Sequence, residues 1–380
     1  MKRYISAIKL AVVLLAIGAA LGKYSGRTRL APRQTVQVTS TSPTADVDVD
    51  FAHEPLWAYG FDKPPAPGDT AVPQLPPTRA LRPDKDSAEQ TRPIRLDGSR
   101  ASYSLVDIRD GHNAIDWFPE DHPPMPRVVA NGPAALGERG RGCGFCHLPN
   151  GKGRPENAPL AGLPVPYFIR QLEDFRSGRR RSAEPRKANT NTMIELAKAL
   201  TDEEARDAAE YFASIPYTSW IRVVETDSVP TMRIVGNLFL PISRKKAEPI
   251  AGRIIEVPED VEQTELYRNP RSGFIAYVPT GSIEKGADLV TTGGLAMQGN
   301  RQARQKTTPC GTCHGSDLMG LADVPPVAGR SPSYLVRQLW DIRQDTRNGI
   351  AAQAMKPVVA NLTGDDLVAI AAYVSSRHGR

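Results

Sequence analysis

One pentapeptide pattern occurs twice in this chain, as CGFCH at residues 143–147 and as CGTCH at residues 310–314. The two copies contain all four cysteines of the 380-residue sequence, Cys143, Cys146, Cys310 and Cys313. In Cys-x-x-Cys-His, the two thiols attach one haem covalently and the adjacent histidine lies beneath the iron as a ligand. The pattern therefore predicts two covalently attached haem c groups, with His147 and His314 as iron ligands.

Disulfides, a redox pair and a zinc site are the three alternatives to haem for these paired cysteines. An even number of cysteines in an exported chain would ordinarily suggest disulfides. A redox Cys-x-x-Cys pair needs no following histidine, and no thioredoxin-like βαβ pattern surrounds either copy. Half of a zinc site leaves unexplained why both pairs end in histidine at the same position. The spacing favours covalent haem at both copies.

The two pentapeptides belong to a longer internal repeat. When Cys143 is aligned with Cys310, the identical pairs are Pro159 and Pro326, Ala161 and Ala328, Gly162 and Gly329, Tyr167 and Tyr334, Arg170 and Arg337, Gln171 and Gln338, and Leu172 and Leu339. After Arg176 and Arg343 the offset shortens, because the first copy has five more residues in its loop. At the shorter offset the pairs are Met193 and Met355, Leu200 and Leu362, Thr201 and Thr363, Ala209 and Ala371, and Tyr211 and Tyr373. The chain thus contains one haem-binding unit twice.

Each copy carries further parts of a haem pocket. Twelve residues after the motif histidine stands a proline, Pro159 or Pro326, whose carbonyl we expect to accept a hydrogen bond from Nδ1 of that histidine. An ordinary loop proline is the alternative. The segments VPYFIRQLEDFRSG and SPSYLVRQLWDIRQ then predict amphipathic helices, with Tyr167 and Tyr334 on the haem-facing side. Both tyrosines are core residues even without haem.

The arginines of these helices and two methionines complete the predicted site. Arg170 and Arg337 are candidates for the haem propionates, and a solvated helix surface is their alternative. A thioether ligand suits an electron-transfer haem because it raises the reduction potential and closes the iron to small molecules. Met193 and Met355 each precede, by the same spacing, the tyrosine of a helix that begins Leu-Thr. We predict them as the sixth ligands, with core filling as the alternative.

Other candidate ligands fit less well. Met319 lies only five residues after His314 and has no counterpart in the first copy. Ligation of each iron by two histidines is the weaker alternative, because the other histidines have no matching partners in the repeat. These are His53, His112, His122 and His378.

The repeat resembles the class I cytochrome c domain, with its haem motif, Pro and Ala-Gly loop, axial methionine and alanine-rich closing helix. Arranged twice in one chain, it is similar to the dihaem cytochrome c4 group. The fragments DWFPEDHPPMP, CGFCHLPNGKGRPENAPLAGLP, SGFIAYVPTGSIEKG and GRSPSYLVRQL also resemble exported bacterial dihaem c-type cytochromes. The chain departs from cytochrome c4 by long extra segments before and between the haem units.

The N-terminus reads as an export signal. Lys2, Arg3 and Lys9 precede the apolar run LAVVLLAIGAALG, which is too short to span a bilayer comfortably. An uncleaved membrane anchor is the alternative to a cleaved signal. Either way, we expect the body of the chain in the periplasm. The net charge of +6 falls to +3 without these three basic residues, so composition gives no reason to expect a nucleic-acid partner.

The extra segments differ in composition. Eight prolines between Pro64 and Pro93 predict an extended stretch, and the preceding EPLWAYGFDKPP is expected to pack on a haem domain. WIRVVE, TMRIVGNLFLPI, GRIIEVP and GFIAYVP predict short strands. We therefore predict a mainly α fold in which a small β-rich insert joins two class I cytochrome c domains. The predicted parts are a signal or anchor (1–22), a Pro-rich arm (23–98), a first cytochrome c domain (99–217), the insert (218–280) and a second cytochrome c domain (281–380).

The predicted function follows from the expectation that both axial positions of each haem iron are filled. An iron with two protein ligands exchanges single electrons and binds no substrate. We expect an electron carrier or electron-transfer subunit rather than an enzyme. Its donor would be a periplasmic dehydrogenase or another redox protein, and its acceptor a terminal oxidase or another cytochrome. The alternative is a haem enzyme with one open or labile haem, such as a peroxidase or a sulfur-compound-oxidising cytochrome. A structural module that merely carries haem would not explain two matched methionines.

Overall fold

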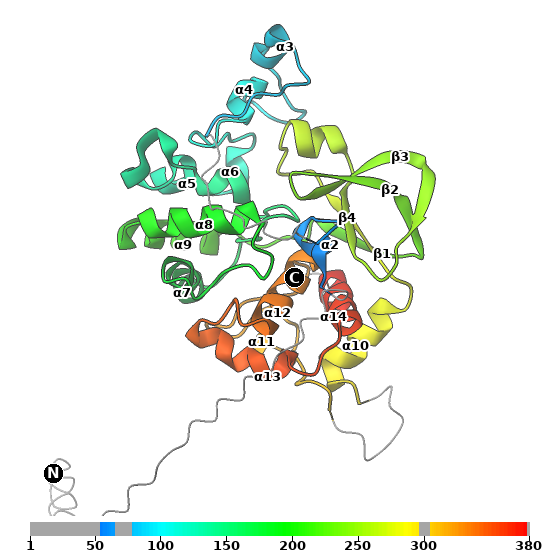
Figure 1. The fold of residues 1–380 in the computed structure, drawn as a ribbon. Coiled ribbons are helices and arrows are strands. Elements are labelled where there is room, and N and C mark those ends of the chain that lie inside the picture. The colour runs from blue at the N-terminus through cyan, green and yellow to red at the C-terminus, as the bar shows by residue number, and fades with distance from the viewer. Residues whose placement is uncertain (1–53, 65–77, 296–304, 378–380) are drawn as a thin grey trace, which may run out of the picture. The chain divides into compact units, whose positions relative to one another are not determined.

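The computed structural model describes residues 54–64, 78–295 and 305–377, which include both pentapeptides and all of the matched positions of the repeat. The predicted signal or anchor (1–22) lies outside the described residues, as does part of the predicted arm. The fold is mainly helical with two small sheets, as predicted (Figure 1). The predicted domain boundaries stay predictions.

The first repeat is built from helices around one apolar core. Its helices are α5 (Arg127–Asn131), α6 (Cys143–His147), α7 (Val165–Arg176), α8 (Ala188–Ala199) and α9 (Asp202–Ser214). α9 begins where predicted, because Thr201 and Glu204 form a reciprocal capping box. Phe168 of α7 stacks on Phe212 of α9 with ring centroids 6.0 Å apart. This contact joins the helix after the pentapeptide to the closing helix.

The second repeat has a similar order of elements, but a 3-10 helix and a short α-helix stand where the first repeat has α8. It contains α10 (Ser282–Thr292), α11 (Gly311–His314), α12 (Pro332–Arg343), a 3-10 helix (Ile350–Met355), α13 (Lys356–Val359) and α14 (Gly364–Ser376). A capping box of Thr363 and Asp366 begins α14. α10 crosses α14 closely, since a Cβ at Gly286 would lie 2.0 Å from the carbonyl oxygen of Ala369. Only glycine permits that approach.

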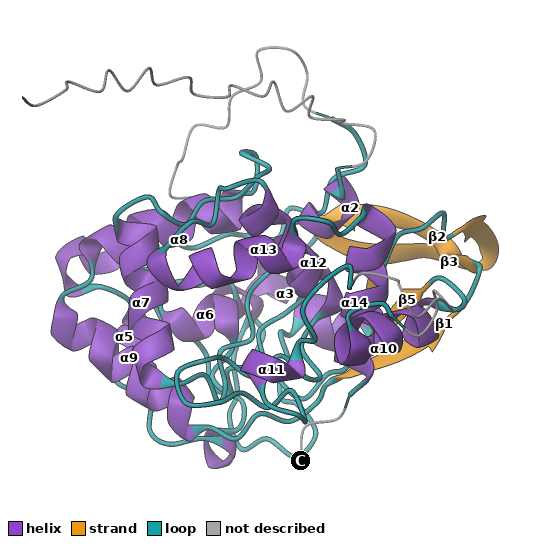
Figure 2. Ribbon diagram, turned by 90° about the horizontal axis from the view of Figure 1, so that it is seen from below, coloured by secondary structure: helices purple, strands orange, loops and turns teal. Residues whose placement is uncertain are grey.

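The predicted strands between the repeats are confirmed. They are β1 (Ile221–Glu225), β2 (Ser228–Val235), β3 (Leu238–Pro249), β4 (Ile255–Pro258) and β5 (Phe274–Val278). One sheet has the order β1-β5-β4, with β1 and β5 parallel, and β2 pairs with β3 as a separate antiparallel ribbon. Figure 2 shows the strands at one end, beside α10 and α14.

The insert packs against both repeats. Leu238 and Phe274 belong to the core of the first repeat. Ile254 and Val278 belong to the core of the second. The insert is therefore packed into the apolar cores of both repeats that it joins.

The segment before the first repeat differs in part from the prediction. The stretch from Pro64 to Pro93 contains a short helix, α3 (Ser87–Thr91), because the Asp86 carboxylate caps it by accepting from the Glu89 N–H. Two more short helices, α2 (Leu56–Tyr59) and α4 (Leu105–Ile108), flank this stretch. The expected packing of α2 on a haem domain is confirmed, since the buried Tyr59 donates to Asp341 of α12 (2.7 Å).

No single helix within the described ranges is long and apolar enough to cross a membrane. Ile350–Val359 and Gly364–Ser376 satisfy the length and composition test only as a pair, and they are bent by 113° where they meet.

A buried arginine ties the two repeats together. Arg330 is 2% exposed and donates from Nε to the carbonyl of Pro326 (2.8 Å). Its other nitrogens donate to the carbonyls of Pro159 (2.8 Å) and Ala161 (2.9 Å) in the first repeat. Its guanidinium also lies 4.5 Å from the ring centroid of Tyr217. One side chain therefore satisfies carbonyls of both proline loops.

Replacing this arginine should loosen both loops. Arg330→Met would leave three buried carbonyls without their donor, at a cost on the order of 1 to 3 kcal/mol each. We expect the free energy of unfolding to fall by about 3 kcal/mol in urea titrations. Arg206→Met, on the exposed face of α9, is the matched control and should change it by less than about 0.5 kcal/mol. Equal effects of the two variants would contradict this role for Arg330.

Candidate functional site

The first pentapeptide opens onto a cavity of about 220 Å³, here called the first cavity. Cys143, Cys146 and His147 of α6 line it together with Met193 of α8. The apolar part of its wall includes Leu160, Phe168, Leu172, Leu196 and Leu200. The structure thus brings the two predicted thioether cysteines and both predicted axial ligands of this repeat to one space.

The second pentapeptide opens onto a similar cavity of about 320 Å³, here called the second cavity. Cys310, Cys313 and His314 line it together with Met355. Its apolar wall includes Val327, Leu335, Leu339, Ile342, Val358 and Ile370. Met319, which the sequence disfavoured as a ligand, does not line either of these two cavities.

Each motif histidine is held by a backbone carbonyl, but one residue earlier than predicted. Nδ1 of His147 donates to the carbonyl of Ala158 (2.7 Å), and Nδ1 of His314 donates to that of Pro325 (2.8 Å). The predicted acceptors, Pro159 and Pro326, are wrong in this detail. Successive carbonyls of extended backbone point in different directions, so only the carbonyl before each proline faces the imidazole.

The ionisation of the pentapeptide residues suits haem attachment better than redox chemistry. The described residues contain all four cysteines as free thiols. Burial raises the pKa of Cys143 to about 12 and that of Cys310 to about 11, whereas redox-active pairs have a lowered thiol pKa. Burial lowers the pKa of His147 to about 4. A neutral imidazole that donates through Nδ1 leaves Nε2 as a metal ligand.

A contact between the two repeats, here called the inter-repeat seam, consists of matched residues. Its members are Tyr167, Gln171 and Arg180 of the first repeat and Tyr334, Gln338 and Arg347 of the second. Arg180 donates to Gln338 (2.8 Å) and lies 3.4 Å from the Tyr334 hydroxyl. Arg347 donates to Tyr167 and Gln171 (both 2.9 Å). The two arginines therefore make the same contact in opposite directions.

Sequence reasoning missed these two arginines, although a signal was present. Arg180 and Arg347 are identical when the sequence is aligned on the two pentapeptides. They lie after Arg176 and Arg343, where a shorter offset between the two copies is predicted. Their backbones also form an antiparallel bridge, which places the five extra residues of the first copy after Arg180.

Some residues that were predicted to surround the haem of their own repeat line the cavity of the other repeat instead. Pro159, Tyr167 and Arg170 of the first repeat line the second cavity rather than the first. Tyr334 lines the second cavity and also a small cavity of about 60 Å³ next to His147. Each repeat therefore contributes side chains to the surroundings of the other, because α7 and α12 face each other across the seam.

The two predicted propionate arginines differ in environment. Arg170 has a side chain that is 42% exposed and pairs with Asp323 (3.1 Å), which matches the alternative of a solvated helix surface. Arg337 is buried and donates to the carbonyls of Ala58 (2.5 Å) and Pro155 (2.7 Å). The solvated alternative is therefore wrong for Arg337, which lines the small cavity.

The cavities fit haem in chemistry. Apolar walls suit the macrocycle, and a histidine and a methionine line each cavity. Haem also carries two carboxylates, which cannot be buried without polar partners. Buried Lys187, Arg180 and Arg337 line the small cavity beside His147. Among the described residues, no group of three His, Cys, Asp or Glu side chains forms another metal site.

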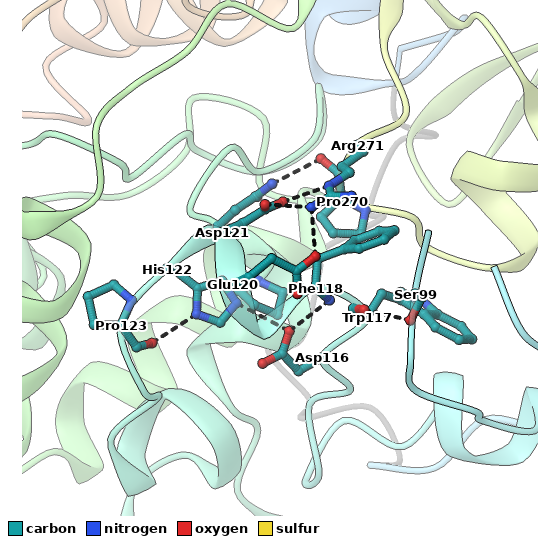
Figure 3. Close-up of polar contacts among 12 residues, drawn as sticks. Ser99, Asp116, Trp117, Phe118, Glu120, Asp121, His122, Pro123, Pro270 and Arg271 are labelled. Atoms are coloured by element: carbon teal, nitrogen blue, oxygen red, sulfur yellow. Dashed lines mark hydrogen bonds and ion pairs between the residues drawn. The ribbon is translucent and has the colours of Figure 1, made fainter. Parts of the chain in front are cut away.

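The histidines of the weaker alternative lie elsewhere. His122 contacts Asp116 through Nε2 (3.2 Å) and Pro123 through Nδ1 (2.9 Å), as Figure 3 shows. His112 contacts the carbonyl of Gly140 (3.2 Å), and neither histidine lines the first or the second cavity. His53 and His378 lie outside the described residues.

The DWFPEDHPPMP segment instead anchors the insert to the first repeat. Arg271 of the insert donates to Asp121 (2.6 and 2.8 Å) and Glu120 (2.9 Å) (Figure 3). Its guanidinium lies 3.7 Å from the ring centroid of Phe118. On the other side, Nδ1 of His122 lies 2.9 Å from the hydroxyl of Tyr211 in α9. The segment therefore links the insert to the closing helix.

The His122 network should make stability depend on pH. Burial lowers the pKa of His122, but Asp116 and the Pro123 carbonyl raise it more, so the net shift is upward. A raised folded-state pKa adds stability that is complete below the unfolded pKa of about 6.5 and is lost as pH rises through the folded value.

We expect the stability advantage of the unchanged protein over His122→Gln to shrink as pH rises above about 6.5. Urea unfolding at several pH values measures it. Asp116→Asn, which removes the partner carboxylate, should flatten this dependence. An advantage that grows with pH would contradict the upward shift.

Comparisons with known proteins agree with the two cavities. Residues 129–216 match the family model described as cytochrome c, and residues 294–374 match that described as cytochrome c oxidase, cbb3-type, subunit III. Cytochrome c4 of Pseudomonas aeruginosa is 24% identical over 66% of this chain and 90% of its own length. A thiosulfate dehydrogenase electron acceptor of Stutzerimonas stutzeri is 25% identical over 62% of this chain and 78% of its own length.

A shorter relative has a higher sequence identity over a shorter stretch. Cytochrome c-554(548) of Halomonas halodenitrificans is 38% identical over 73 residues, which are 19% of this chain and 88% of that protein. Two cytochrome c units and the similarity to cytochrome c4 support two covalently bound haem c groups. The chain belongs to the cytochrome c family, as a dihaem, cytochrome c4-like electron-transfer protein.

Proposed function

We propose that this cytochrome relays single electrons in the periplasm from a dehydrogenase or another redox protein to a terminal oxidase or another cytochrome. The observation that carries the proposal is that a motif histidine and a methionine line each cavity. Haem iron with both axial positions filled exchanges one electron with little rearrangement and offers no site to a substrate.

The residues of the chain have distinct roles in this proposal. Cys143, Cys146, Cys310 and Cys313 would form the thioethers. His147 and His314 would each hold an iron through Nε2, oriented by the carbonyls of Ala158 and Pro325. Met193 and Met355 would supply the second protein ligand of each iron. The apolar walls exclude water, which favours the reduced state because it carries less charge.

The inter-repeat seam lies between the two haem sites in this account. Arg180 belongs to the first repeat and contacts two side chains of the second. Arg347 makes the reciprocal contact. These hydrogen bonds hold the repeats in a fixed relation, so an electron received at one haem has a constant path to the other.

The names of the relatives and the N-terminal segment support the wider setting. The Stutzerimonas stutzeri relative is named as an electron acceptor of thiosulfate dehydrogenase, which supports an oxidising enzyme as the donor. The apolar segment at residues 10–22, preceded by basic residues, supports export. The alternative of a haem enzyme is less well supported, because both cavities contain a candidate sixth ligand and every cysteine belongs to a pentapeptide.

Substitution of each methionine tests the proposal. Met193→His should lower the reduction potential of one haem and Met355→His that of the other, since imidazole stabilises the oxidised iron more than a thioether does. Optical redox titration measures both potentials.

Met319→Leu is the matched control, because Met319 is a partly buried core methionine of the second repeat. It should leave both potentials unchanged. Unaltered potentials in Met193→His or in Met355→His would overturn the ligand assignment for that repeat.

A further inference from the structure

We infer that Lys187 binds a carboxylate of the haem in the first cavity, and that this contact raises the reduction potential of that haem relative to the other. The inference rests on the proposed assignment of His147 and Met193 to this haem. It concerns a residue that lies in the loop of the first repeat and has no equivalent in the second.

Lys187 is a buried side chain with few partners. It is 2% exposed, and its Nζ donates to the carbonyl of Tyr59 at 3.2 Å. Within the part of the chain that the structure describes, no carboxylate lies within 4.0 Å of this nitrogen. An ammonium group has three donors, so one neutral acceptor leaves most of its capacity unused.

Such a group is costly to bury without an anion. Burial lowers the pKa of Lys187 well below its usual value, because the charged form loses its hydration. Nearby opposite charge reverses this effect by favouring the charged form. The position of Lys187 in the fold therefore makes sense when an anion is bound next to it.

The place of Lys187 identifies that anion. Lys187 lines the small cavity of about 60 Å³ together with His147 and Met193. Five residues line both this small cavity and the first cavity: His147, Glu156, Asn157, Asn189 and Met193. The wall of the first cavity is largely apolar. A haem carboxylate attached there would find its polar surroundings in the adjoining small cavity.

The other buried charged side chains of the small cavity have partners, although Oε2 of Glu156 has none among the described residues. Arg180 donates to Gln171 and Gln338 (3.0 and 2.8 Å). Arg337 donates to two backbone carbonyls. Glu156 pairs with Arg154 (3.1 Å), and Asp341 accepts from Tyr59 and from the Ala183 N–H. Among the three buried cations of the small cavity, Lys187 thus has the fewest hydrogen-bond partners.

The second repeat lacks this cation. The five extra residues of the first copy lie between Arg180 and Met193, where Lys187 occurs. The corresponding segment of the second copy, residues 348–354, contains no basic residue. A positive charge close to a haem favours its reduced form, which carries one positive charge less. Lys187 should therefore raise the potential of the first haem, whereas the cations that line the second cavity, Arg170, Arg330 and Arg347, have protein partners of their own.

Lys187→Met tests the inference by optical redox titration of the full-length dihaem protein. The change is made in the Met193→His background, where the potential of the first haem is set apart from that of the second. We expect the equilibrium constant for reduction of the first haem to fall roughly tenfold, which is about 59 mV for one electron. The potential of the second haem should not change.

Three further variants separate charge from structure. Lys187→Gln should act like Lys187→Met and serves if the methionine variant folds poorly. Lys187→Arg keeps the charge and should retain most of the potential. Lys198→Met, at the exposed end of α8 where Lys198 pairs with Glu195 (3.0 Å), should have no effect.

An unchanged potential in Lys187→Met, or an equal fall in Lys187→Arg, would overturn the inference. If Met193→His itself moves neither potential, the ligand assignment fails instead. In that case Lys187→Met in the otherwise unchanged protein decides, since a fall in one potential supports the inference and two unchanged potentials overturn it.

Discussion

The hydrogen bond from each motif histidine to a backbone carbonyl is the interaction on which the rest of the structure depends. Ala158 accepts from His147, and Pro325 accepts from His314. The next carbonyl in each loop accepts from Arg330. One buried guanidinium therefore positions the two loops that orient both imidazoles. Because Arg330 belongs to the second repeat but binds the loops of both, the two sites are not mechanically independent.

Buried charge distinguishes the contact between the repeats. The side-chain hydrogen bonds of Arg180 and Arg347 go to tyrosine and amide groups rather than carboxylates, and Nε of Arg347 has no partner among the described residues. Such neutral partners do not themselves balance the positive charge of the two buried guanidinium groups. Two haem groups would bring four carboxylates to this region, so the seam is built for a protein that contains its cofactors. The carbonyls of Ala58 and Tyr59 accept hydrogen bonds from Arg337 and Lys187. Both of these side chains line the small cavity next to the first site.

The sequence predicted the repeated elements well and their orientation less well. The pentapeptides, the capped closing helices and the strands of the insert follow from local patterns, and all are present. The acceptor of His147 was predicted one residue too late, because spacing does not tell which way a carbonyl points. Tyr167 lines the cavity of the other repeat, which depends on how α7 meets α12. Arg330 aligns with Leu163 when the two pentapeptides are superimposed, so no comparison of the two copies could have found it.

The central claim is that both irons have a histidine and a methionine as ligands and leave no position open. Carbon monoxide binding to the dithionite-reduced protein tests this claim most directly, because the visible spectrum changes when the gas occupies a free axial position. If both irons are ligated by histidine and methionine, the spectrum of both haems should stay unchanged. Prompt formation of a carbon monoxide adduct at either haem would contradict it and would favour an enzyme with an open site.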